Sequence, residues 1–275
     1  PSILHGWDGT YRVGCARRMI AGMDLSHARI LVTNDDGINA PGLKVLEKVA
    51  KSLAKEVWTV APETEQSGAG HSLTLTQPLR MRRLSKQRYA VSGSPTDCVL
   101  FAICYLMTDN PPDLVLSGVN RGANIGDDVT YSGTVAAAME ATILEIPAIA
   151  LSQQTNGDRV AHWPTVAKHA PDVVRRLVAA GWPSDVFMNV NFPDCAPSEV
   201  ISVNVVPQGR RKAGYEIREL VDPRLAEVIA EETNAQVMLF SPLEALTPDE
   251  IGTNISYIDK MEQNLDSLVV ALECQ

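Results

Sequence analysis

The stretch LVTNDDGINAPG, residues 31–42, joins an apolar run to two adjacent aspartates. Such a run is typical of a strand that is buried on both faces. Asp35 and Asp36 repel each other, and each disfavours ionisation of its neighbour unless a positive charge lies beside them. Pro41 suits the first turn of a helix. The stretch therefore predicts a strand, an acidic loop that needs a cation, and a helix.

Strand and helix patterns alternate around this stretch. Strands are expected at 28–34, 56–62, 112–120 and 146–152, and helices at 41–55, 96–107 and 133–145. Residues 71–84 and 88–95 alternate in hydrophobicity and predict a β-hairpin excursion. Repeated strand–helix–strand units indicate an α/β fold, with a mostly parallel sheet and helices on both faces. Such a sheet binds ligands at the carboxyl ends of its strands.

The composition and net charge limit the kinds of partner that the protein can bind. A net charge of -9 and a pI of about 5.1 supply no broad basic surface for a nucleic-acid duplex or an anionic membrane. No apolar run is long enough to span a bilayer. The five cysteines form no CxxC pair and predict reduced thiols. We expect a cytoplasmic protein whose anionic ligand, if it has one, is small and bound locally.

Three polar loops follow the expected strands: residues 33–37, 61–72 and 117–134. Taken singly, each reads as a turn or a helix cap. Ser132 to Thr134 also begin an alanine-rich helix, whose free N–H groups and dipole favour an anion. The occurrence of all three loops at successive strand ends predicts one ligand site.

The oxygen atoms of these loops indicate a metal. Carboxylate, hydroxyl and amide oxygens suit Mg²⁺ or Mn²⁺, whereas zinc prefers His or Cys. A hard cation beside an anion-holding helix start is suited to phosphate chemistry by a metal-activated water. No GxSxG motif surrounds Ser67 or Ser132, and the sequence shows no carboxylate partner for His71. We therefore expect water to be the nucleophile, with Asp35 or Asp36 as its base.

Four motifs resemble one known family. They are ILVTNDDGINAPGL (30–43), VAPETEQSGAGHSLTL (60–75), SGSPTDCV (92–99) and the run at 114–152. Together they resemble the SurE (survival protein E) family of metal-dependent 5′-nucleotidases, roughly over residues 28–210. The resemblance implies a Rossmann-like, doubly wound phosphatase for nucleoside 5′- and 3′-monophosphates. Many members of the family also trim polyphosphate, as exopolyphosphatases.

The resemblance also implies the site residues. One divalent ion per subunit, Mg²⁺ or Mn²⁺, is expected on the side chains of Asp35, Asp36, Ser67 and Asn120. Phosphate contacts are expected from Asn124, Ser132, Gly133 and Thr134.

The two ends of the chain depart from the family pattern. Residues 1–27 look like an N-terminal extension, and residues 28–222 form the expected catalytic domain. Residues 223–275 diverge and have helical character near 224–232 and 258–273. The resemblance implies a homodimer or homotetramer built through a C-terminal arm, and the divergence puts that arm in question.

Two other functions fit parts of the pattern. The loops would also suit a nucleotide- or phosphate-binding module without turnover. A phosphatase of the HAD type would form an aspartyl-phosphate, but it needs a DxD arrangement, and NDDGIN has adjacent aspartates. Tyr131 is the one aromatic residue of the site loops, so broad use of purine and pyrimidine monophosphates is expected.

Overall fold

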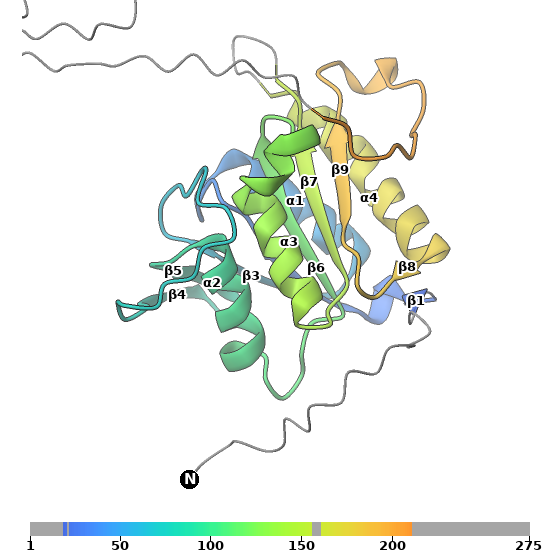
Figure 1. Cartoon of the computed structure of the whole chain (residues 1–275). Helices are drawn as coiled ribbons and strands as arrows, with labels where there is room; N and C mark the ends of the chain where they lie inside the picture. The colour runs from blue at the N-terminus through green and yellow to red at the C-terminus, as the bar shows by residue number, and fades with distance from the viewer. Residues whose placement is uncertain (1–18, 21, 156–160, 211–275) are drawn as a thin grey trace, which may run out of the picture. The chain divides into compact units, whose positions relative to one another are not determined.

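The main sheet is mostly parallel (Figure 1). The computed structural model describes residues 19–20, 22–155 and 161–210. Within them, seven strands form one sheet, in the order β4 (Met81–Ser85), β5 (Arg88–Val91), β3 (Glu56–Pro62), β2 (Arg29–Thr33), β6 (Leu114–Arg121), β7 (Ala148–Gln153) and β9 (Met188–Phe192). Only β4 is antiparallel to its neighbour. The predicted α/β class is confirmed.

The strand order places the ligand crevice. The parallel strands lie in the spatial order β5-β3-β2-β6-β7-β9, so the chain winds outward in both directions from β2 and β6. In doubly wound sheets, ligands bind outside the carboxyl ends of the strands where the winding reverses. That position lies beyond Thr33 and Arg121, the last residues of β2 and β6.

Helices cover both faces of the sheet (Figure 1). One face carries α1 (Pro41–Leu53) and α4 (Trp163–Ala180), and the other carries α2 (Pro95–Phe101) and α3 (Gly133–Ile143). Strand β2 shows the division, because Ile30 and Val32 join the α1/α4 core while Leu31 joins the α2/α3 core. This alternation follows from the two-residue period of a strand. Buried apolar side chains thus pack on both faces of the sheet below the strand ends.

Short elements complete the described residues. They are a β1 (Met19–Ile20) to β8 (Trp182–Pro183) pair, 3₁₀ turns at Leu25–His27, Gly126–Thr130 and Pro197–Glu199, and a π-helical turn at Ala102–Leu106 that continues α2. No helix among the residues described is both long and apolar enough to cross a membrane.

The predicted hairpin excursion is shorter than the sequence suggested. β4 and β5 pair as expected, but residues 71–80 form no strand. Thr74 instead uses its backbone N–H and its hydroxyl on the two carboxylate oxygens of Asp97, at 3.0 and 2.6 Å. These bonds tie the segment to the start of α2, and Leu75 is left 84% exposed. Alternation alone does not show whether a neighbouring strand is available.

Besides these short elements, α4 and β9 lie where the sequence analysis assigned no helix or strand. Helix α4 buries Val166, Val173 and Val178 on one side, a helical spacing, and contains Pro171. The short strand β9 pairs with β7. The structure divides the chain into Pro1–Lys212 and Ala213–Gln275. Most of the predicted extension at 1–27, and the divergent segment at 223–275, lie outside the described residues.

Candidate metal and phosphate site

A cleft of about 480 Å³ opens at the carboxyl ends of the central strands. Its lining comprises Asp35, Asp36, Glu65, Ser67, Gly68, Asn120, Arg121, Gly122, Ala123, Asn124, Asp128, Tyr131, Ser132 and Thr155. All four side chains predicted to bind metal are present, from the loops after β2 and β3 and from the end of β6. Of the predicted phosphate contacts, Asn124 and Ser132 line the cleft. The strand order thus brings together residues up to 120 positions apart, Asp35 and Thr155.

Asp35 is the most deeply placed carboxylate of the cleft, with 4% of its surface exposed. Burial raises its pKa, and hydrogen bonds from the hydroxyl and backbone N–H of Thr134 act in the opposite direction. Gly133 packs directly against it, because a Cβ atom at Gly133 would lie 2.8 Å from the Asp35 Cβ. The start of α3 therefore holds Asp35 by close packing and by hydrogen bonding.

Asp36 is half-buried beside Asp35. Its pKa is raised to about 6, first by burial and then by the charge of Asp35. The backbone N–H and the charge of Arg121 lower the pKa but do not offset the rise. The repulsion expected from adjacent aspartates is therefore present in the fold, and a cation between them would relieve it.

The two neutral side chains of the predicted metal set are oriented by local hydrogen bonds. Ser67 donates its hydroxyl to Glu65 Oε1 at 2.8 Å, and Gln66 N–H donates to the Asp35 carbonyl at 2.7 Å, which ties this loop to the loop after β2. Asn120 donates Nδ2 to the Gly122 carbonyl at 2.8 Å. Its Oδ1 is then the atom left to serve a cation, as a metal ligand requires.

The donor chemistry fits a hard divalent ion. Among the residues described, no three His, Cys, Asp or Glu side chains are grouped to hold a metal. The cleft instead combines two carboxylates with a hydroxyl and an amide oxygen. Oxygen donors of this kind suit Mg²⁺ or Mn²⁺, which keep several waters and need few protein ligands.

The predicted phosphate contacts occupy the start of α3 and the loop before it. Ser132 is the N-cap of α3, and its Oγ accepts from the Val135 N–H at 3.1 Å. Thr134 is fully buried and gives its hydroxyl to Asp35. Asn124 is 6% exposed and donates Nδ2 to Ser152 Oγ at 2.9 Å. The Thr134 hydroxyl thus serves Asp35, while Ser132 and Asn124 face the cleft.

The structure adds residues that the sequence analysis did not single out. Glu65 lines the cleft and bonds Ser67, and Arg121 is the one cationic lining residue. Arg121 follows Asn120 directly, which was the available signal. His71, for which the sequence showed no carboxylate partner, pairs with Glu140 of α3 at 2.8 Å. The two are 69 positions apart, so no local pattern reveals them, and neither lines the cleft.

Comparison with known proteins follows the same motifs. The family described as "Survival protein SurE" matches residues 30–215, more than half of the chain. The chain belongs to the SurE family. The resemblance predicted from the sequence is confirmed, and the match spans the three loops of the cleft as well as β9.

Individual SurE relatives are similar over most of their length. A "5'-nucleotidase SurE" of Paramagnetospirillum magneticum is 60% identical over 201 residues, which cover 73% of this chain and 77% of the relative. One of Parvibaculum lavamentivorans is 56% identical over 199 residues, with coverages of 71% and 72%. The crystal structure of a SurE protein from Aquifex aeolicus superposes with a TM-score of 0.65 at 41% identity, covering 71% of this chain and 78% of that one.

Proposed function

We propose that this SurE chain is a divalent-metal-dependent 5′-nucleotidase that hydrolyses nucleoside monophosphates to nucleoside and phosphate. The observation that best supports this proposal is that Asp35, Asp36, Ser67 and Asn120 line one cleft beside the start of α3. Relatives named 5′-nucleotidases at 54–60% identity support the same enzyme class. Action on 3′-monophosphates and on polyphosphate belongs to the proposal as well.

The metal set consists of Asp35, Asp36, Ser67 and Asn120, with one Mg²⁺ or Mn²⁺ per subunit. An ion bound there supplies charge neutralisation for phosphoryl oxygens and lowers the pKa of a water molecule. Thr134 holds the Asp35 carboxylate in place through its hydroxyl. Asp35 and Asp36 are both candidates for accepting the proton of the attacking water.

The phosphate is held by the chain beside this set. Ser132 begins α3, and the first N–H groups of a helix point at an anion and favour it through the helix dipole. Asn124 and Arg121 line the same cleft and offer an amide and a positive charge. These groups recognise the phosphoryl group that every nucleoside monophosphate shares.

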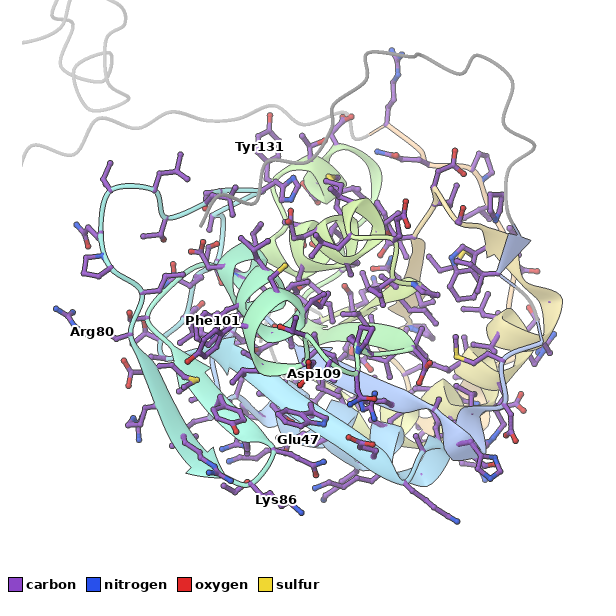
Figure 2. All side chains as sticks on the ribbon, turned by 90° about the horizontal axis from the view of Figure 1, so that it is seen from below. Glu47, Arg80, Lys86, Phe101, Asp109 and Tyr131 are labelled. Atoms are coloured by element: carbon purple, nitrogen blue, oxygen red, sulfur yellow. The ribbon has the colours of Figure 1, made fainter. Side chains whose placement is uncertain are left out.

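The cleft offers few contacts to the nucleobase of the substrate. Tyr131 is the aromatic residue of the lining, is 62% exposed and points outward (Figure 2). An exposed ring allows stacking with any base, and stacking does not discriminate between bases as placed hydrogen bonds do. We therefore propose broad activity on purine and pyrimidine monophosphates. Monoesters are favoured over diesters, which have one fewer free phosphoryl oxygen.

One assay tests the reaction against the alternative of a non-catalytic binder. Phosphate release is measured from 5′- and 3′-monophosphates, polyphosphate and a diester, with Mg²⁺, Mn²⁺ or chelator. Release that requires metal supports the enzyme, whereas nucleotide binding without release supports the binder. Direct attack by water leaves no covalent intermediate, so acid quenching during turnover should trap no phosphoenzyme, and a trapped aspartyl-phosphate would establish the covalent route instead.

Assembly and location also belong to the proposal. A homodimer or homotetramer is proposed from family membership, and a cytoplasmic location from the composition. The segment 223–275 that was expected to bear on assembly lies outside the described residues. Light scattering on the full chain tests the assembly, and a monomer would contradict it.

A further inference from the structure

Two asparagines of the edge strand β9 reach toward the cleft. Met188 and Val190 of β9 pack on the α1/α4 core. Because side chains alternate along a strand, Asn189 and Asn191 project from the opposite face. No carboxylate or cation of β9 accompanies them, since the strand reads MNVNF. Both amides bind the same residue of the cleft loop, Asn124.

The contact with Asn191 has two parts. Asn191 Oδ1 accepts from the Asn124 backbone N–H at 2.8 Å, and Asn191 Nδ2 donates to the Asn124 carbonyl at 3.0 Å. Asn189 Nδ2 donates to the same carbonyl at 2.9 Å. Ser152, at the end of β7, accepts from the Asn124 side chain at 2.9 Å. The backbone and the side chain of Asn124 are therefore held from two neighbouring strands.

The loop around Asn124 needs such support. It lies between β6 and the turn at Gly126–Thr130, and it contains Gly122 and Gly126 with φ of 124° and 60°. Glycines give the chain conformational freedom, so they do not fix the loop by themselves. Asn124 nevertheless lines the cleft while being 94% buried, which requires a defined position.

We propose that Asn191 is a positioning residue for phosphate binding, with Asn189 and Ser152 in support. It acts on the substrate only through Asn124, whose amide is thereby fixed beside the phosphate. This inference rests on the proposed function and on the phosphate contact of Asn124. It gives the edge strand β9, which supplies no lining residue of the cleft, a part in substrate affinity.

The first test compares two variants of β9 in the full chain. Asn191→Ala removes both of its bonds to Asn124 and should raise the KM for a nucleoside monophosphate about tenfold. The kcat should stay within about threefold, and the Kd for Mn²⁺ measured by calorimetry within about twofold, since the metal set is untouched. Asn189→Ala is the matched control, because the Asn124 carbonyl keeps its bond from Asn191; its KM should change less than about threefold.

A double-mutant cycle decides whether the effect passes through Asn124. Asn124→Ala should raise KM, and adding Asn191→Ala should raise it no further. Ser152→Ala, a small change at the other anchor, should also raise KM. Additive effects, or a fall in kcat with KM unchanged, would overturn the positioning role. An unchanged KM in Asn124→Ala would overturn it too, whereas absence of phosphate release by the wild-type chain would overturn the proposed function.

Discussion

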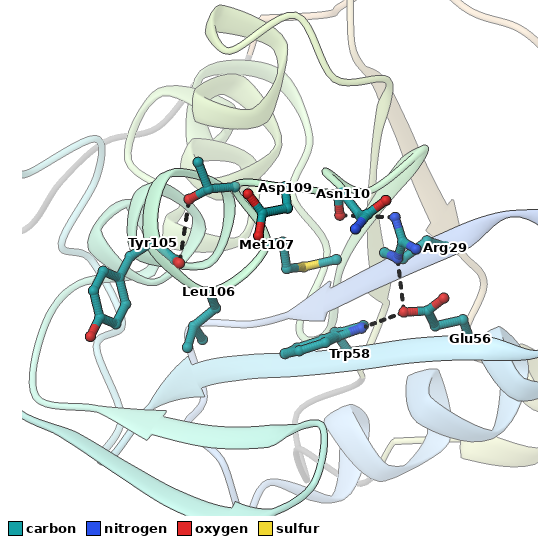
Figure 3. Close-up of a pocket in the computed structure, with 9 residues that line it drawn as sticks. Arg29, Glu56, Trp58, Tyr105, Leu106, Met107, Asp109 and Asn110 are labelled. Atoms are coloured by element: carbon teal, nitrogen blue, oxygen red, sulfur yellow. Dashed lines mark hydrogen bonds and ion pairs between the residues drawn. The ribbon is translucent and has the colours of Figure 1, made fainter.

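The two ends of the same sheet carry polar pockets of opposite character. At the amino ends of β2 and β3, Arg29, Glu56 and Trp58 line a pocket of about 190 Å³ with the residues after α2 (Figure 3). Arg29 Nε lies 2.8 Å from Glu56 Oε1, and Trp58 Nε1 donates to the same oxygen at 3.0 Å. Arg29 Nη1 also donates to the Asn110 carbonyl at 2.9 Å. The charges of Arg29 and Glu56 are therefore paired with each other within this pocket.

The cleft at the carboxyl ends instead brings the adjacent carboxylates of Asp35 and Asp36 together in a buried place. Burial raises the pKa of Asp35 and, together with the Asp35 charge, raises that of Asp36 to about 6. At the other end, the hydrogen bond from Arg29 lowers the pKa of Glu56. A carboxylate that the protein has already paired serves stability, whereas two that the protein forces together need an external cation. The contrast distinguishes a functional pocket from a structural one without reference to size.

The largest expected effect comes from Asp36→Asn in the cleft. The substitution keeps the shape and removes one formal charge, so Mn²⁺ affinity and kcat/KM should fall together. Removing a residue that hydrogen-bonds to a metal ligand lowers metal affinity or activity about 10- to 100-fold. Removing the charge of a direct ligand should lower them at least about 100-fold. Titration of phosphate release with Mn²⁺ checks both quantities. Full activity of the variant in chelator would refute the metal site.

The second-largest effect is expected from disturbing the packing of α3 against Asp35. Gly133→Ala would place a Cβ atom 2.8 Å from Asp35 Cβ and 3.1 Å from Asp35 Oδ2, so the carboxylate must move. A displacement of this kind should lower kcat/KM about 10- to 100-fold, with weaker Mn²⁺ binding. Gly209→Ala is the control, because a Cβ atom there meets nothing within 4 Å. Equal activity of the two variants would show that Asp35 is not held by Gly133.

The sequence predicted the residues of the cleft better than the hydrogen bonds that hold those residues in place. The resemblance to the SurE family implied Asp35, Asp36, Ser67 and Asn120, which lie just after or at the end of strands. The parallel-sheet rule brings such strand ends together. The hydrogen bond from Thr134 to Asp35 joins residues 99 positions apart. The hydrogen bonds between Asn191 and Asn124 join residues 67 positions apart. No period or spacing encodes such pairs. Residues 71–80 show the opposite failure: they alternate in hydrophobicity as a strand does, but the fold places no strand beside them to pair with.

The pH dependence of stability should have opposite signs at the two pockets. An unfolded Asp36 releases its proton near 3.8, but the folded, metal-free chain keeps it to about 6. Between these values the native state binds more protons, so the free energy of unfolding falls as pH rises. With solvent screening, the Asp36 contribution should be about 1–2 kcal/mol between pH 4 and pH 7.

Urea unfolding of the chelated chain and of Asp36→Asn measures that contribution as a difference. The variant should be the more stable of the two at pH 7, and the difference should vanish near pH 4. Saturating Mn²⁺ should stabilise the wild type and not the variant. Equal stability of the two metal-free proteins across this range would contradict the repulsion inferred for the cleft.

The smallest effect is expected at the pocket of Figure 3. The pKa of Glu56 is lowered by Arg29, so its pairing stabilises the fold above its unfolded pKa and is lost as pH falls. Its side chain is 39% exposed, which limits the contribution to about 0.5 kcal/mol. Glu56→Gln should therefore lower the free energy of unfolding by about that amount at pH 7, less at 1 M salt. Phosphate release should stay within about twofold of wild type, because no group of this pocket faces the cleft. A tenfold loss of kcat/KM with unchanged stability would mean that a satisfied pocket can also be functional, and the distinction drawn between the two ends of the sheet would fail.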